Sequence, residues 1–443
     1  MKSRFDINYN LPKYTILEDK LYQAFGKKLK TISDIADVVC GPFGSAIKNS
    51  DYQDSGIPLI RITNITKDGY MNYDDLIFIS EKLGDSLSRT QVSPGDIVIS
   101  QRGSLGQCAI VGSTLPKMNI SANIIAIKNI NGVSASFLHD YFLSTLGQAL
   151  LERSVSGQVQ QKITTQDIAD LLIPIDTDET KLTAILDYAY TSYKSKIQQA
   201  EDLLAGMSSY IFDILSIAPI KFNFQLCCKV KMTDLISDKT FSAEYYHPER
   251  MAAISNMKAV SAFNVRKLID IVDFCRDVVS CSENSKKYLG LAGVESQTGE
   301  LSGTDEEASG QAFSYDVDDV LYGRLRPYLN KVLLAEESGI CSTEFHVMRA
   351  KDQSVVLPEY LASIMRSDLI LSQTKHMMTG NTHPRISNDD VQNLYVPVPD
   401  ISVQRIIVNE LKKRRTQVRR LKQEAEQEWA AAKAKFEKEL LGE

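Results

Sequence analysis

One stretch of the chain places its apolar residues in a heptad pattern. Between residues 186 and 214, apolar side chains recur at alternating spacings of four and three residues. They are Leu186, Tyr190, Tyr193, Ile197, Ala200, Leu204, Met207, Ile211 and Ile214. An average spacing of about 3.5 residues is typical of a coiled-coil seam, whereas a helix packed on its own domain shows a wider stripe with a period of about 3.6. We therefore predict a long helix that pairs with another helix.

A second helical pattern lies near the end of the sequence, where Arg414 interrupts the apolar positions. Those positions are Ile407, Leu411, Val418, Leu421, Ala425, Trp429, Ala432, Phe436 and Leu440. This stretch carries a basic cluster made of Lys412, Lys413, Arg414, Arg415, Arg419, Arg420 and Lys422. The first helix is rich in Asp and Glu, so opposite charges favour pairing of the two helices with each other. Each exposed ion pair contributes only about 0.2–1 kcal/mol.

The remaining sequence predicts mixed secondary structure. Residues 57–63, 96–100 and 122–130 are short and β-rich, whereas residues 134–145 and 357–368 have helical periodicity. The predicted fold class is α+β (mixed α/β), with two similar domains, each followed by a long helix, and the two helices packed as an antiparallel coiled coil.

An internal repeat supports this organisation. Residues 4–12 (RFDINYNLP) align with residues 240–248 (TFSAEYYHP) at a shift of 236, and the same shift places Ile32 on Leu268. Farther along the chain the shift becomes 223, which aligns residues 94–103 with residues 317–326. Four later pairs keep this second shift: Gly157 with Gly380, Ile163 with Ile386, Asp167 with Asp390, and Pro174 with Pro397.

The repeat predicts the domain boundaries. We expect the order to be a leader and first domain, a first long helix, a connector, a leader and second domain, and a second long helix. The corresponding ranges are 1–175, 176–215, 216–240, 241–398 and 399–443.

Length, composition and charge exclude several classes of protein. A chain of 443 residues exceeds the usual domain size of about 100–200 residues, and its apolar fraction of 43% is that of a globular protein. A net charge of −6 argues against a protein that coats nucleic acid without sequence preference. There is no apolar run long enough for a membrane span and no signal peptide, so we expect a cytoplasmic protein. The seven scattered cysteines and five dispersed histidines predict no bound metal.

Several sequence strings, in this order and doubled along the chain, resemble the specificity subunit of type I restriction-modification enzymes. They are GPFGSAIKNSDY (41–52), GIPLIRITNI (56–65), PGDIVIS (94–100), GRLRPYLNK (323–331), ICSTEFHVMRA (340–350) and VPVPDISVQRIIVNEL (396–411). FSAEYYHP (241–248) before the second domain adds to the likeness. The second half departs from the pattern, because residues 275–291 replace the GPFGS-type loop. The two domains are therefore expected to read different bases.

The resemblance implies a function for the whole chain. Each target-recognition domain would read one half of a bipartite, asymmetric site in double-stranded DNA, and the helices would set the spacing between the halves. Two methyltransferase subunits would bind this scaffold, and restriction-translocase subunits would join them. No cofactor would belong to this chain, because the methyltransferase partner would use S-adenosylmethionine and the motor partner ATP and Mg.

The sequence lacks the catalytic motifs that would favour an enzyme over this interpretation. An adenine methyltransferase needs an N-P-P-[YF] or D-P-P-[YF] tetrapeptide, which the sequence lacks. The CGPFGS string fits no phosphate-binding loop, and the histidines have no H-E-x-x-H spacing. We therefore expect a non-catalytic subunit and no catalytic residues.

The DNA-reading candidates follow from base chemistry, because Arg and Lys pair with guanine O6 and N7, and Asn and Gln pair with adenine N6 and N7. Two loops at matching places in the repeat, 156–162 and 379–385, supply one set. That set is Gln158, Gln160, Gln161, Lys162, Asn381, His383 and Arg385. The others are Lys48, Arg61, Asn64, Arg102, Arg324 and Arg326. Gln-rich loops are more often simply solvated, and the arginines could form salt bridges at strand edges.

Two other functions stay open from the sequence. The chain could serve a different DNA-modification defence system that lacks the type I motor, and the partner genes would separate these cases. It could instead be a coiled-coil adaptor whose repeated domains bind protein. An enzyme is the third alternative.

Overall fold

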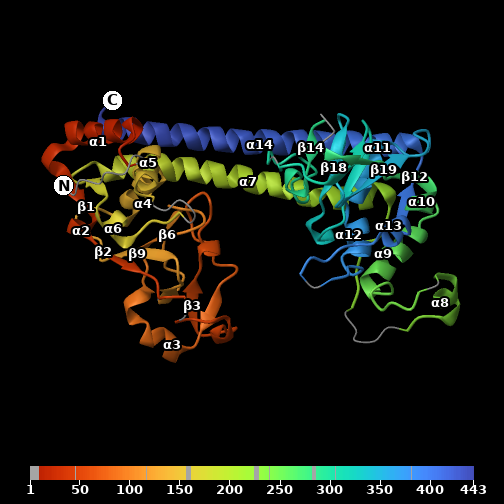
Figure 1. Ribbon diagram of the computed structural model, residues 1–443, viewed down its shortest axis with the longest axis horizontal. Coiled ribbons are helices and arrows are strands. Elements are labelled where there is room, and N and C mark those ends of the chain that lie inside the picture. The colour runs from red at the N-terminus through yellow and green to blue at the C-terminus, as the bar shows by residue number, and fades with distance from the viewer. Residues whose placement is uncertain are drawn as a thin grey trace. The chain divides into compact units, whose positions relative to one another are not determined.

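The computed structural model describes residues 9–44, 46–115, 117–155, 161–223, 229–238, 240–281, 286–304, 306–380 and 382–443. The chain forms two compact units (Figure 1). Unit 1 comprises Met1–Lys196 and Gln423–Glu443, and unit 2 comprises Ile197–Lys422. Two long helices, α7 (Glu179–Leu215) and α14 (Ile401–Leu441), each contribute one part to unit 1 and the other part to unit 2.

Unit 1 combines a helical layer with strands. Its helices besides the long ones are α1 (Pro12–Phe25), α2 (Ile32–Ile35), α3 (Glu81–Ser86), α4 (Ala135–Leu143), α5 (Thr145–Ser154) and α6 (Thr165–Ala169). Its strands are β1 (Leu29–Thr31), β2 (Asp37–Cys40), β3 (Ile57–Ile60), β4 (Ile77–Ile79), β5 (Gln91–Val92), β6 (Ile97–Ser100), β7 (Cys108–Ile110), β8 (Met118–Ile120), β9 (Ile124–Lys128) and β10 (Leu172–Pro174).

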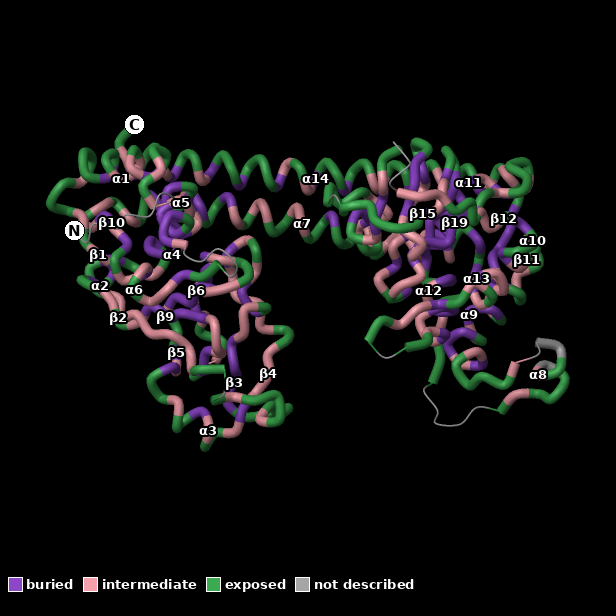
Figure 2. Tube along the Cα trace, viewed as in Figure 1, coloured by how far each residue is buried: buried purple, intermediate pink, exposed green. Residues whose placement is uncertain are grey.

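The strands of unit 1 form one short ribbon and two larger sheets. Among the described residues, β1 pairs with β10, one antiparallel sheet has the order β2-β9-β6-β7, and a mixed sheet has the order β4-β3-β8-β5. In the mixed sheet β3 and β8 run parallel. Buried residues lie along β3, β6, β8 and β9 and on the inner faces of α4 and α5 (Figure 2). There Phe137, Tyr141 and Phe142 of α4 pack with Ile125 and Ile127 of β9.

Unit 2 contains a similar, though not identical, set of elements. Its helices besides the long ones are α8 (Met232–Asp238), α9 (Pro248–Lys258), α10 (Leu268–Ile271), α11 (Pro358–Met365), α12 (Asp368–Thr374) and α13 (Asn388–Gln392). Its strands are β11 (Asn264–Lys267), β12 (Val272–Cys275), β13 (Val278–Ser280), β14 (Tyr288–Leu289), β15 (Gln311–Tyr315), β16 (Val320–Gly323), β17 (Val332–Leu334), β18 (Gly339–Ser342), β19 (Phe345–Ala350) and β20 (Tyr395–Val398).

Among the described residues, the short ribbon and the antiparallel sheet of unit 2 match those of unit 1. The mixed sheets share three equivalent strands and differ in the fourth, because β4 lies beside β3 in unit 1 and β13 lies beside β15 in unit 2. β11 pairs with β20, an antiparallel sheet has the order β12-β19-β16-β17, and a mixed sheet has the order β13-β15-β18-β14. The registers agree as well, since Thr31 faces Leu172 in unit 1 and Lys267 faces Tyr395 in unit 2. These partners are related by the shifts of 236 and 223, so the sequence repeat is also a structural repeat.

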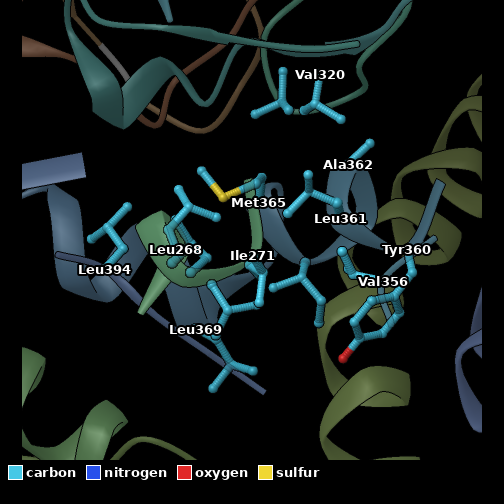
Figure 3. Packing of buried hydrophobic residues seen from close by; sticks show 14 of the residues in the cluster. Leu268, Ile271, Val320, Val356, Tyr360, Leu361, Ala362, Met365, Leu369 and Leu394 are labelled. Atoms are coloured by element: carbon cyan, nitrogen blue, oxygen red, sulfur yellow. The ribbon is translucent and has the colours of Figure 1, made fainter. Parts of the chain in front are cut away.

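Figure 3 shows the apolar core of unit 2, where Leu361 and Met365 of α11 lie beside Leu268 and Ile271 of α10. The same group includes Leu394, just before β20. Local capping supports both cores. The Ser387 hydroxyl accepts the Asp390 N–H at 3.1 Å, and at the equivalent place in unit 1 the Thr164 hydroxyl accepts the Asp167 N–H at 3.2 Å.

The two long helices pack antiparallel within each unit. In unit 1 Lys181 bonds Glu439 and Lys196 bonds Glu428, so residue numbers rise on α7 as they fall on α14. Trp429 packs against Tyr190 and Tyr193 with ring centroids 6.0 and 6.2 Å apart. The expected α+β fold with two similar strand-rich domains and paired long helices is confirmed.

The seam in unit 2 follows the same direction, with one correction to the predicted positions. Ala200 of α7 packs with Val418 and Leu421 of α14, and Leu204 lies beside them. Ile214 does not continue the seam, because it is 38% exposed and Leu215 is buried instead. The remaining predicted seam positions are buried or half-buried: Leu186, Tyr190, Tyr193, Ile197, Met207, Ile211, Leu411, Ala425 and Trp429.

Among the described residues, no helix combines enough length and apolar character to span a membrane.

Candidate nucleic-acid interface

Three strands of the antiparallel sheet in unit 1 meet at one end. Cys40, the last residue of β2, pairs with Ile125 of β9, and Ser100, the last residue of β6, pairs with Ile124. These pairings place the end of β2, the end of β6 and the beginning of β9 at the same edge. The loops that leave this edge are 41–48, 101–106 and 121–123. We call this the loop end of unit 1.

Two further segments reach the loop end through backbone hydrogen bonds. The Ile163 N–H donates to the Gln101 carbonyl at 3.1 Å, which places Gln161 and Lys162 beside Arg102. The Ser121 N–H donates to the Ile60 carbonyl at 2.8 Å and brings in the segment that begins with Arg61. These bonds gather five separate stretches of sequence.

The close packing at the loop end explains the glycine of the GPFGS string. The Gly41 N–H donates to the Ile124 carbonyl at 2.8 Å. A Cβ atom at Gly41 would lie 2.1 Å from the Ser121 carbonyl oxygen, which is too close for any side chain. Glycine is therefore required for loop 41–48 to approach the turn at 121–123.

The candidate side chains of unit 1 differ in their availability. Lys48, Gln161 and Lys162 are exposed, whereas Arg102 is half-buried. Arg61 is half-buried, and its Nη2 donates to the Asp75 carbonyl at 2.8 Å. Gln158 and Gln160 lie outside the described residues.

Asn64 has a different role from the predicted base contact. It is fully buried, its Oδ1 accepts the Arg61 N–H at 2.9 Å, and its Nδ2 donates to the Asn72 carbonyl at 3.2 Å. Asn64 thus closes the turn that follows β3. Its buried amide group already bonds the backbone and is not accessible to a DNA base. Asparagine commonly bonds nearby backbone in this way.

Unit 2 has an equivalent loop end. Cys275 of β12 pairs with Val347 of β19, and Gly323 of β16 pairs with Phe345, so these strands also finish together. The Ile386 N–H donates to the Arg324 carbonyl at 3.0 Å. This bond corresponds to the one from Ile163 to Gln101 in unit 1, at a shift of 223 for both partners.

The candidate side chains of unit 2 also divide into two groups. The Arg385 guanidinium binds the Glu344 carboxylate, with Nη2 2.7 Å from Oε1 and Nε 3.0 Å from both oxygens. These bonds raise the pKa of Arg385, so the guanidinium stays charged and braced. Arg326 and His383 are exposed, and Arg324 is half-buried. Asn381 lies outside the described residues.

The fold adds residues that the sequence alone did not single out. Burial raises the pKa of the Cys40 thiol, and the charges of Arg102 and Arg89 act against this, which places Arg89 near the loop end of unit 1. Phe43 is 91% exposed in loop 41–48. In unit 2, Arg276 follows directly after β12 at the loop end. Only the strand registers bring Arg89 and Arg276 to these places, so no local motif could have revealed them.

One cluster of side chains in the described residues has the composition of a metal site. His247, Glu249 and His376 offer ligand atoms within 4.8 Å of one another. The Glu249 carboxylate already accepts hydrogen bonds from Ser372, Lys375 and His376, and His247 caps α9 by accepting the Glu249 N–H. Burial raises the pKa of Glu249, but the bonds from His376 and Lys375 outweigh burial and lower it. We interpret the cluster as an ion-pair network that holds α9 against α12.

Comparison with known proteins shows the family. The Type I restriction modification DNA specificity domain matches residues 26–199 and 291–427, which is more than half of the chain. The chain belongs to this family.

Curated relatives and solved structures are similar to parts or most of the chain. The specificity subunit of the type I restriction enzyme EcoDI from Escherichia coli is 24% identical over 125 residues, and the match covers 27% of each chain. The EcoBI specificity subunit from Escherichia coli is 23% identical over 206 residues, covering 45% of this chain and 42% of the relative. The matches thus span less than half of the length of these relatives. The S subunit of a type I restriction-modification system from M. genitalium is 14% identical, with a TM-score of 0.43, covering 93% of this chain and 95% of that structure.

Proposed function

We propose that this chain is the DNA-reading specificity subunit of a type I restriction-modification complex and that it carries no catalytic chemistry of its own. One observation supports the proposal most directly. Both units collect separate loops at one end of an antiparallel sheet, through the same backbone bond at a shift of 223. Membership of the specificity-domain family points to the same partner, DNA.

The side chains on these loops suggest how a bipartite target would be read. Unit 1 offers Gln161 and Lys162 as exposed amide and ammonium groups, and unit 2 offers His383 and Arg326. These groups differ between the units, whereas the scaffold is the same. The two halves of the target would therefore have different sequences, and the whole target would be asymmetric.

The proposal assigns the rest of the chemistry to partners. Two methyltransferase subunits would be held by this chain and would use S-adenosylmethionine to modify adenine, and restriction-translocase subunits would use ATP and Mg. The paired helices α7 and α14 would set the spacing between the two half-sites.

Methylation mapping tests the proposal. The chain is coexpressed with the methyltransferase encoded beside it, and modified adenines are mapped across the host genome. Wild-type protein should yield one asymmetric, interrupted target. Lys162→Ala should relax preference in one half, and Arg326→Ala in the other half, by about 1–3 kcal/mol of discrimination.

A matched control uses an exposed lysine away from the loop end. Lys30→Ala, in β1, should leave the target unchanged. No methylated target with wild-type protein would refute DNA reading and would favour a protein-binding adaptor. A chain whose neighbouring genes encode a methyltransferase but no motor subunit would belong to a modification system without the type I motor.

A further inference from the structure

A small cavity opens at the loop end of unit 2, and the base-reading candidates do not account for it. Its volume is about 160 Å³, and its polar lining comes from Arg276, Arg324, His346 and Asn388. Phenylalanine rings and Val347 form most of the remaining wall. None of the described residues that line the cavity carries a carboxylate. The lining is therefore rich in hydrogen-bond donors and positive charge.

Two polar atoms of this lining are buried without a protein partner. His346 is only 4% exposed, and its Nε2 accepts or donates no hydrogen bond among the described residues. The Nε atom of Arg324 is also buried and has no hydrogen-bond partner among the described residues. Buried polar atoms are nearly always satisfied in native proteins. A ligand that accepts hydrogen bonds would satisfy both of these atoms.

The charge states of the residues that line the cavity favour binding of an anion. Burial lowers the pKa of His346 to about 4, and the charges of Arg324 and Arg276 contribute to this. Hydrogen bonds with the Ile386 backbone and the Asn388 side chain oppose this shift but do not outweigh it, so the imidazole is neutral at neutral pH. The tautomer that carries its single proton on Nε2 can donate into the cavity. Glu344, whose backbone carbonyl accepts the Arg324 N–H, has its carboxylate bound to Arg385. The acidic group next to this segment is therefore engaged elsewhere.

Unit 1 has different residues at the positions equivalent to three of these four polar side chains. The shift of 223 places Gln101 where unit 2 has Arg324, Asn123 where it has His346, and Thr165 where it has Asn388. The shared scaffold does not need two arginines and a histidine at this place. The group is specific to unit 2 and calls for an explanation beyond folding.

We propose that this cavity binds one phosphate group of the DNA backbone, with Arg276 and Arg324 as its cationic contacts and His346 and Asn388 as further donors. Guanidinium groups bind phosphate oxygens with two parallel hydrogen bonds, and aromatic walls exclude competing water. This inference rests on the proposed function. It assigns Arg324, selected above as a base-reading candidate, to positioning of the duplex rather than to sequence reading.

The first test compares binding to specific and nonspecific DNA. The full chain with its methyltransferase partner is titrated with a duplex that carries the mapped target and with a scrambled duplex, over a series of salt concentrations. Arg276→Gln and Arg324→Gln should each weaken binding to both duplexes by the same factor, about tenfold. Each should also reduce the slope of log affinity against log salt by about 1.

Other outcomes of this test distinguish failure of the phosphate assignment from failure of the proposed function. Loss of affinity for the target duplex alone would overturn the phosphate assignment and make the arginines base readers. Unchanged affinity for both duplexes would also overturn it while leaving the proposed function intact. If the wild-type complex did not prefer its target over the scrambled duplex, the proposed function itself would fail. Arg326→Ala is the contrasting variant, because it should lower the preference for the target.

A second measurement does not depend on any substitution. The chain has five histidines, so the histidine side-chain resonances of the isotopically labelled full chain are few. Inorganic phosphate should shift the His346 resonance with saturation, and chloride at matched ionic strength should not. A His346 resonance that responds equally to both salts, or to neither, would overturn the proposal even if the variants failed to fold.

Discussion

Glu249 and Lys375 form an ion pair at 2.7 Å between α9 and the end of α12, and the equivalent pair in unit 1 has its charges exchanged. There Lys13 of α1 lies 3.5 Å from Glu152 of α5. The positions correspond through the shifts of 236 and 223. Each leader helix therefore docks on its own domain with opposite polarity, and an exchange of the two helices would place like charges together.

The exchanged pairs predict a charge-reversal experiment. Glu249→Lys should destabilise the chain by about 2 kcal/mol, because the Glu249 side chain is only 7% exposed and would leave buried partners unsatisfied. Adding Lys375→Glu should recover about half of the loss. Urea unfolding measures both. Lys13→Glu is the control, since the Lys13–Glu152 pair is largely exposed and its loss should cost under about 1 kcal/mol. A double variant no more stable than Glu249→Lys would contradict this reasoning.

The helix seam predicts a sharp contrast between two apolar positions. Trp429 is 5% exposed between Tyr190 and Tyr193, so Trp429→Ala should destabilise unit 1 by about 3–5 kcal/mol. Ile214→Ala should change stability by less than about 0.5 kcal/mol, because Ile214 is exposed. Thermal and urea unfolding of both variants test the assignment. Equal losses would show that Ile214 belongs to the seam.

Acid should destabilise unit 2 through His346. The pKa of His346 falls from its ordinary value of 6.5 to about 4 in the folded chain, through burial and the charges of Arg324 and Arg276. Between these values the unfolded chain binds a proton that the folded chain does not, so stability falls as pH drops from 6.5 toward 4. The full contribution is about 3 kcal/mol.

A non-titrating variant isolates this effect from the other acidic groups. The difference in unfolding free energy between wild type and His346→Gln, measured at pH 7 and again near pH 4, should change by that amount. His383→Gln, at an exposed position in the same unit, should keep the wild-type dependence. A His346→Gln chain with the wild-type pH dependence would remove His346 as the cause.

Asn64 should affect stability rather than target choice. Asn64→Ala removes the amide that bonds the Arg61 N–H and the Asn72 carbonyl, and we expect a loss of about 1–2 kcal/mol. Unfolding measurements give the loss, and methylation mapping at reduced temperature gives the target. An altered half-site in a stably folded Asn64→Ala chain would restore Asn64 as a base reader.

The internal repeat made much of the fold predictable. The shift of 223 that aligns Ile163 with Ile386 also relates the hydrogen bonds that these residues make, because the strands and turns around them are equivalent. The paired long helices followed from the heptad pattern. That pattern failed at Ile214, one residue before the end of α7, where Leu215 instead packs in the core of unit 2. The spacing of apolar residues along one helix does not indicate where that helix stops contacting a second helix and begins to contact the core of a domain.

The side chains at the loop ends were less predictable than the scaffold. The Arg385–Glu344 pair joins residues 41 positions apart, and only the strand registers bring them together. Asn64 could have been recognised from turn chemistry, because a short amide side chain after a strand often bonds the local backbone. Base chemistry alone identifies residue types that can contact DNA, but not those already committed to the protein.

The bonds from Ile163 to Gln101 and from Ile386 to Arg324 use only main-chain atoms. Their strength is therefore independent of the side chains on the loops that they hold together. A lineage could replace those side chains one after another, and acquire new targets, without first evolving a new way to anchor the loops. Diversification of recognition and maintenance of the fold are in this sense separate problems for selection, solved by different atoms of the same residues.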